Sequence, residues 1–174
     1  MNVKPRIWML PALAAAIFAI GIVVVLVFSS KTSDSIRSVG QVDFPYLDAT
    51  TQFAAQLEAL GATIQSAVAE GEKKRLDEAK DRAASIRKLL AAISRIDGKA
   101  DVGGQLTKSF EAYYAASVET AELFLGMRQG DQAGAIPKMQ SALKKLEGEL
   151  ATARVEASEG FDAGLERAHQ GVSS

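Results

Sequence analysis

Apolar residues recur at alternating spacings of four and three along four separate segments of this chain. That spacing places them on one stripe of an α-helix, which is the stripe that a helix buries in a bundle. Short turns separate the segments, so the sequence predicts an all-α fold with an antiparallel up-down-up-down four-helix bundle. The four stripes are Tyr46, Thr50, Phe53, Leu57, Leu60, Ile64 and Ala67; Leu76, Ala79, Ala83, Ile86, Leu90 and Ile93; Leu106, Phe110, Tyr113, Ser117, Ala121, Phe124 and Leu125; and Met139, Leu143, Leu146, Leu150, Ala153, Ala157, Phe161 and Leu165.

Turn-forming residues set the expected ends of these helices. We expect helices over residues 31–70, 72–97, 105–128 and 132–170. Glycines or Asp-Gly end the first three, Asp131 can cap the fourth, and Val102-Gly103-Gly104 reads as part of a turn. Pro45 is expected to kink the first helix or to mark a short break in it.

An uncharged run from Ile7 to Ser30 precedes the stripes. As a helix it is long enough to cross a hydrocarbon layer of ~30 Å. Lys4 and Arg6 before the run favour a cytoplasmic N-terminus. The sequence therefore predicts a cytoplasmic segment 1–6, a transmembrane helix 7–30 in a bacterial inner membrane, and a periplasmic domain 31–174. A cleaved signal peptide is the alternative, although its apolar region is normally shorter.

Composition excludes several kinds of chemistry. The net charge of -1 argues against a nucleic-acid partner, which favours a basic surplus. Cysteine is absent, which removes disulfides, zinc knuckles and thiol catalysis. His169 is the only histidine, whereas a metal site needs several such ligands. We therefore expect no catalytic, metal or cofactor-binding residues and no enzyme activity in this chain.

Four stretches carry a resemblance to a known family. They are VDFPYLDATTQFAAQLEAL, AEGEKKRLDEA, FEAYYAASVETAELFLG and MQSALKKLEGELATARVEASEGFDAGLERA. With the apolar run before them, they resemble the extracytoplasmic four-helix sensor domain of methyl-accepting chemotaxis proteins, sensor histidine kinases and membrane diguanylate cyclases. The resemblance implies a dimeric ligand-sensing input domain that passes a packing change through its fourth helix.

Such receptors continue into a second transmembrane helix and an output domain, which can be enzymatic. The stretch from His169 to Ser174 stands where that second span would begin. The alternative function is a membrane-anchored helical adaptor or structural protein that binds another periplasmic protein.

The first helix has unusually few charges. No Lys or Arg lies between Phe44 and Glu70. In the amino-acid chemoreceptors that the chain resembles, arginines there clamp a carboxylate, so we expect a neutral or cationic ligand rather than a dicarboxylate. The polar candidates for binding it are Asp48, Thr51, Gln52, Gln56 and Thr63.

A second seam of mostly small residues follows the same helix. It consists of Asp48, Gln52, Ala55, Ala59, Ala62 and Ser66. Small residues would let another helix approach closely, so this seam is the expected homodimer interface. An exposed, alanine-rich face is the alternative, since helix propensity alone permits it.

Tyr113 and Tyr114 are adjacent on the third expected helix. Only one of them can point squarely inward, and the other should lie at the rim with a wet hydroxyl. This pair is also a candidate for lining a ligand pocket.

Overall fold

The computed structural model describes residues 39–172, and the side chains of residues 39–170. A π-helical turn, η1 (Val39–Asp43), leads into the α-helices α2 (Phe44–Glu70), α3 (Arg75–Arg95), α4 (Ala100–Phe124) and α5 (Gln132–Val172). This part of the chain contains no strand, so the all-α prediction is confirmed for it. The run 7–30 and the first residues of the expected helix 31–70 lie outside the described residues. Within residues 39–172, no helix combines the length and the apolar character that a membrane span requires.

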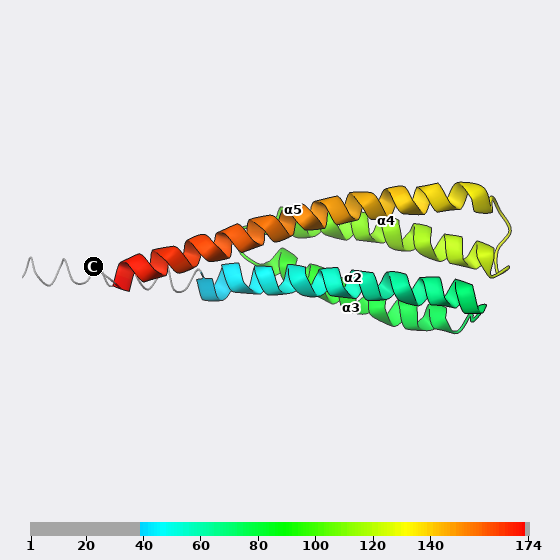
Figure 1. Ribbon diagram of the computed structural model, residues 1–174, viewed down its shortest axis with the longest axis horizontal. Helices are drawn as coiled ribbons and strands as arrows, with labels where there is room; N and C mark the ends of the chain where they lie inside the picture. The colour runs from blue at the N-terminus through cyan, green and yellow to red at the C-terminus, as the bar shows by residue number, and fades with distance from the viewer. Residues whose placement is uncertain (1–38, 173–174) are drawn as a thin grey trace, which may run out of the picture.

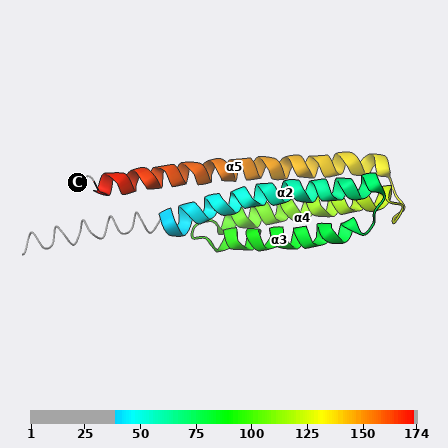
Figure 2. The same cartoon turned by 60° about the horizontal axis from the view of Figure 1, so that its bottom comes forward.

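Consecutive helices lie side by side and run in alternate directions (Figures 1 and 2). The α2–α3 and α4–α5 turns lie together at one end of the molecule, and α3 and α4 stop short of the other end (Figure 1). Beyond them, η1 contacts only α2 and α5 among the described elements, and Phe44 at the start of α2 packs against Phe161 of α5. We call this two-helix segment the stalk: residues 39–45 together with residues 157–170.

Burial follows the apolar stripes closely. Every stripe residue on α2 and α3 is buried. In the middle of the core, the rings of Phe53 and Phe110 meet edge to face with centroids 6.2 Å apart. Two stripe residues are instead exposed, Phe124 by 44% and Leu165 by 46%. Phe124 is the last residue of α4, and Leu165 lies on the stalk, where neither α3 nor α4 covers it.

The expected break near Pro45 takes the form of η1. This wider helical turn ends at Asp43, and Pro45 lies in the first turn of α2. Proline has no N–H to donate, and its ring crowds the carbonyl four residues earlier. A local π-helical turn relieves that crowding without ending the helix.

The sequence-based assignment of Val102-Gly103-Gly104 to a turn is wrong. Helix α4 begins at Ala100 and includes all three residues. Gly103 is buried against α3, and a Cβ atom there would lie 2.8 Å from both the Cα and the backbone N of Ser94. The glycine therefore permits close contact between two helices instead of a turn. At its other end α4 stops at Phe124, earlier than expected, because Gly126 adopts a left-handed φ of 68°.

The adjacent glycines of α4 provide a matched test of this contact. Gly103→Ala should lower the free energy of unfolding by about 1–3 kcal/mol, because the new methyl group meets the α3 backbone. Gly104 has no atom within 4 Å of its would-be Cβ. Gly104→Ala should therefore raise the stability by about 0.5–1 kcal/mol. Urea unfolding followed by circular dichroism measures both, and equal effects would contradict the α3–α4 contact.

Candidate functional site

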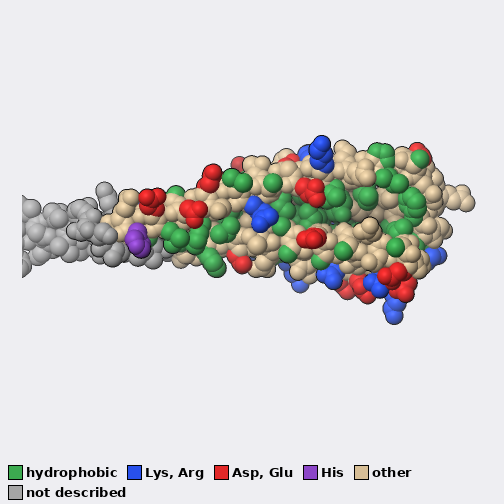
Figure 3. Space-filling model, viewed as in Figure 1, with side chains coloured by type: hydrophobic (Ala, Val, Ile, Leu, Met, Phe, Trp, Pro, Cys, Tyr) green, Lys and Arg blue, Asp and Glu red, His purple; other side chains and the backbone are tan. Residues whose placement is uncertain are grey.

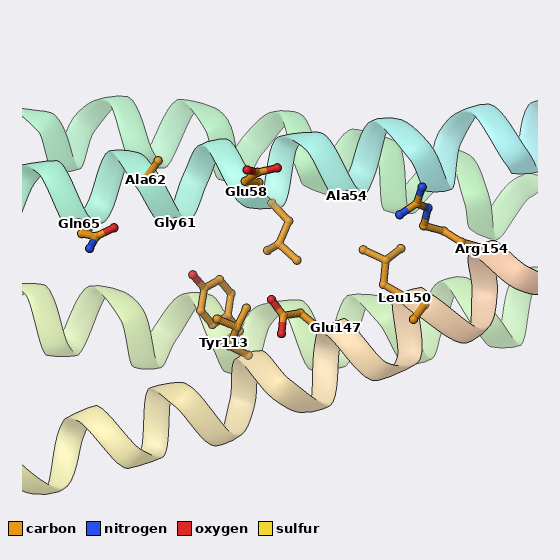
Figure 4. Close-up of a pocket in the computed structure, with 12 residues that line it drawn as sticks. Ala54, Glu58, Gly61, Ala62, Gln65, Tyr113, Glu147, Leu150 and Arg154 are labelled. Carbon is orange, nitrogen blue, oxygen red and sulfur yellow. The ribbon is translucent and has the colours of Figure 1, made fainter.

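A groove runs between α2 and α5 and has Tyr113 of α4 at its floor (Figure 4). It consists of two adjoining hollows of about 690 and 450 Å³, which share Gly61, Gln65, Tyr113 and Leu143. Ligand pockets typically measure about 300–1,000 Å³. Figure 3 shows hydrophobic side chains exposed along the middle of this face, with acidic side chains beside them.

Small residues on α2 leave this space open. Ala54, Gly61 and Ala62 line the first hollow on the α2 side. At Gly61 the missing side chain faces the Tyr113 hydroxyl, which would lie 3.4 Å from a Cβ atom there. Because Gly61 has no side chain at this point of α2, the Tyr113 hydroxyl can reach up between the two outer helices.

The Tyr113 hydroxyl is an unpaired polar group at the floor of the groove. The residue is only 4% exposed, and its hydroxyl forms no hydrogen bond with any described residue. The neighbouring hydroxyl groups in the second hollow already have hydrogen-bond partners. Ser117 donates to the Tyr113 carbonyl at 2.8 Å, and Thr120 donates to the Ala116 carbonyl at 2.7 Å. A tyrosine with a largely buried ring commonly keeps its hydroxyl at a wet edge, where a partner can reach it. The position is therefore one where a ligand atom can complete the hydrogen bonding.

Charged side chains flank the first hollow. Glu58 extends from α2, Glu147 from α5, and Arg154 lies further along α5, near Ala54 (Figure 4). None of the three charged groups forms an ion pair with another described residue. By contrast, Glu149 on α5 accepts a hydrogen bond from Gln105. The two free carboxylates against one guanidinium give the groove a negative balance.

A polar cluster lies where the stalk begins. Lys99, in the α3–α4 turn, donates to Glu156 of α5 at 2.5 Å, and its Nζ lies 4.5 Å from the centre of the Tyr46 ring of α2. Burial, followed by the nearby Glu156 carboxylate, raises the pKa of Tyr46 to about 12. Tyr46 is therefore neutral at physiological pH. The cluster ties the α3–α4 turn to both α2 and α5.

A second aromatic and charged cluster lies on the outer face of α3 and α4. Tyr114 stacks on Phe110 with ring centroids 6.0 Å apart, and the Arg87 guanidinium lies 5.2 Å from the centre of the Tyr114 ring. Arg87 also donates two hydrogen bonds to Glu111, at 2.6 and 2.8 Å, and lowers the pKa of that carboxyl. Every charge here has a partner, so this cluster is structural. Tyr113 is thus the inward member of the tyrosine pair, and Tyr114 is the one at the rim.

The ligand-binding residues expected from the sequence do not gather in the groove. Asp48, Thr51 and Gln52 are exposed on α2, and Gln56 is half-buried. Gln52 donates to Asp48 at 2.7 Å, and Thr51 donates to the Leu47 carbonyl at 2.7 Å. The expected ligand-binding role is most clearly wrong for Thr63. This residue is 8% exposed and donates to the Ala59 carbonyl at 2.9 Å. The structure does not bring these five residues together around a cavity that it describes.

The second seam of α2 lies on the outside of the described chain. Asp48, Gln52, Ala55 and Ala62 are exposed, and Ala59 and Ser66 are half-buried. Only Ala62 also lines the groove. The face is therefore free to contact another molecule, as a dimer interface requires.

The groove residues other than Tyr113 were missed at the sequence level. Glu58 and Gln65 are seven residues apart on α2, and Glu147 and Arg154 are seven apart on α5. Residues at that spacing share a helix face. The signal was present, but spacing along one helix does not say which neighbouring helix the face meets.

Comparison of this chain with protein-family models, curated proteins and solved structures found no match.

Proposed function

We propose that this chain is the extracytoplasmic ligand-sensing input domain of a bacterial transmembrane signalling receptor. In this proposal residues 7–30 anchor it in the inner membrane, and residues 31–174 form a periplasmic up-down-up-down bundle. One observation carries the proposal: the first and last helices, α2 and α5, pair at one end of the molecule beyond α3 and α4 (Figure 1). A receptor needs this arrangement, because both of its membrane connections lie on the same side of the bundle.

Close packing inside the stalk supports a mechanical connection. A Cβ atom at Gly164 would lie 2.6 Å from Val39 Cγ2 and 2.9 Å from Asp43 Oδ2. The rings of Phe44 and Phe161 add a contact with centroids 6.2 Å apart. The two helices therefore touch along the stalk, and a shift of α5 against α2 must rearrange these contacts.

The signal in this mechanism is a change in helix packing, without covalent chemistry. A ligand in the groove lies between α2 and α5, the same two helices that form the stalk. If it binds one α2–α5 arrangement more tightly than another, it shifts the population toward that arrangement. Helix shifts of about 1–2 Å are typical of such transitions. Helix α5 would carry the shift toward a second membrane span.

The exposed face of α2 favours a second candidate, a membrane-anchored helical adaptor that binds another periplasmic protein. This face combines few charges with small side chains and lies open in the described chain. Under the receptor proposal the same face joins two copies of the chain in a homodimer.

Membrane topology tests the receptor proposal first. Alkaline phosphatase fused after Ser174 should be active in a bacterial host, because it folds only when exported. A fusion lacking residues 1–30 is the control and should be inactive. An inactive full-length fusion, together with an active cytoplasmic reporter at the same position, would contradict the proposed orientation.

Disulfide crosslinking tests the homodimer, and the natural lack of cysteine makes the background clean. Ala55→Cys, in the exposed seam of α2, should crosslink to its counterpart in membranes under mild oxidation. Lys145→Cys, exposed on α5, is the matched control and should remain monomeric. The reverse result would move the interface to α5, and crosslinking at neither position would favour the adaptor.

A further inference from the structure

We propose that the α2–α5 groove binds an organic amine: a protonated amino group on an apolar body, with no carboxylate. The biological role of this binding rests on the proposed function, because a sensory input domain needs a ligand. The binding itself depends only on the groove. Three features support it: an unpaired hydroxyl on a largely buried tyrosine, two unpaired carboxylates, and an apolar hollow next to them.

The polar features suit an ammonium group. An ammonium has three N–H donors and no acceptor. Glu147 of α5 lies beside Tyr113, whose hydroxyl points into the groove from α4 (Figure 4). Glu58 lines the same hollow from α2. All three present oxygen acceptors without a partner among the described residues. Charge-assisted hydrogen bonds of this kind are roughly twice as strong as neutral ones.

The second hollow suits an apolar body. It adjoins the first at Tyr113 and is lined mainly by apolar side chains, with no Lys, Arg, Asp or Glu: Ile64, Val68, Ala121, Phe124, Met139 and Leu143 are among them. Burial of apolar surface in such a hollow contributes about 25 cal/mol per Å². A ligand whose amine lies beside Tyr113 can place an aryl or alkyl group there.

The same groove disfavours anions. A carboxylate in the first hollow would face Glu58 and Glu147, and in the second it would find no cationic side chain. Arg154 is the one cation of the groove and lies at its far end, away from Tyr113 (Figure 4). This chemistry separates simple amines from organic acids.

Calorimetry on the 174-residue chain in nanodiscs of zwitterionic lipid tests the proposal, with empty nanodiscs as the blank. The probes are 2-phenylethylamine, the neutral 2-phenylethanol and the anion 3-phenylpropionate, which share one apolar body. The amine should bind at least about tenfold more tightly than the alcohol, since one charge-assisted hydrogen bond accounts for that ratio. The anion should not bind.

Variants then assign the binding to the groove. Glu58→Gln and Glu147→Gln should each weaken amine binding by about tenfold. Glu159→Gln makes the same charge change on an exposed position of α5 outside the groove, and it should leave binding unchanged. Tyr113→Phe should weaken binding several-fold while the thermal unfolding curve stays the same, because the hydroxyl has no partner to lose.

Three outcomes would overturn the inference: no binding of the amine, equal binding of amine and alcohol, or full binding by the Glu58→Gln/Glu147→Gln double variant. Tight binding of 3-phenylpropionate that Arg154→Gln abolishes would make the groove an anion site instead. None of these results affects the phosphatase fusion or the crosslinking. Failure of the ligand assignment is therefore distinguishable from failure of the receptor proposal.

Discussion

Burial of one apolar stripe on each helix is the constraint on which the rest of the structure depends. Large side chains such as Phe53, Phe110 and Leu146 fill the centre and are completely buried. Each such burial contributes about 1.5–3 kcal/mol. Where α2 and α5 face each other, small residues such as Ala54 and Gly61 occupy the α2 side. The groove is therefore present because small residues occupy part of the α2 side of the α2–α5 contact.

The helices that border the groove also form the stalk. Between the groove and the stalk lies the cluster of Tyr46, Lys99 and Glu156, which joins the α3–α4 turn to both α2 and α5. Below it, Gly164 of α5 packs against Val39 and Asp43 of η1. Packed interfaces of this kind rearrange between discrete states more readily than they deform continuously. In the proposed receptor, this continuity carries an event in the groove to the stalk.

Sequence periodicity was sufficient for the buried residues of α3 and for those of α2 except Ala49 and Thr63, because a stripe at four-and-three spacing leaves little freedom in a helix. It failed at Gly103, where a glycine that permits helix contact looks identical to a glycine that permits a turn. It also failed for the ligand residues. Polar residues such as Thr51 and Thr63 were chosen for their chemistry, but their hydroxyls bond to their own helix. The groove depends on how the helices are rotated against one another. The spacing of residues along the sequence does not determine that rotation.

In the proposed receptor, the width of the α2–α5 groove sets the distance between the two sides of the stalk. Gly61→Leu should fill the groove, since even a Cβ atom there lies 3.4 Å from the Tyr113 hydroxyl. Spin labels on cysteines at Gly40 and Glu166 report the stalk distance by electron paramagnetic resonance, and labels at Lys88 and Lys108 report the α3–α4 pair. Gly61→Leu should shift the stalk distance by about 1–2 Å and leave the α3–α4 distance unchanged. A stalk distance that stays the same in the folded Gly61→Leu variant would contradict it.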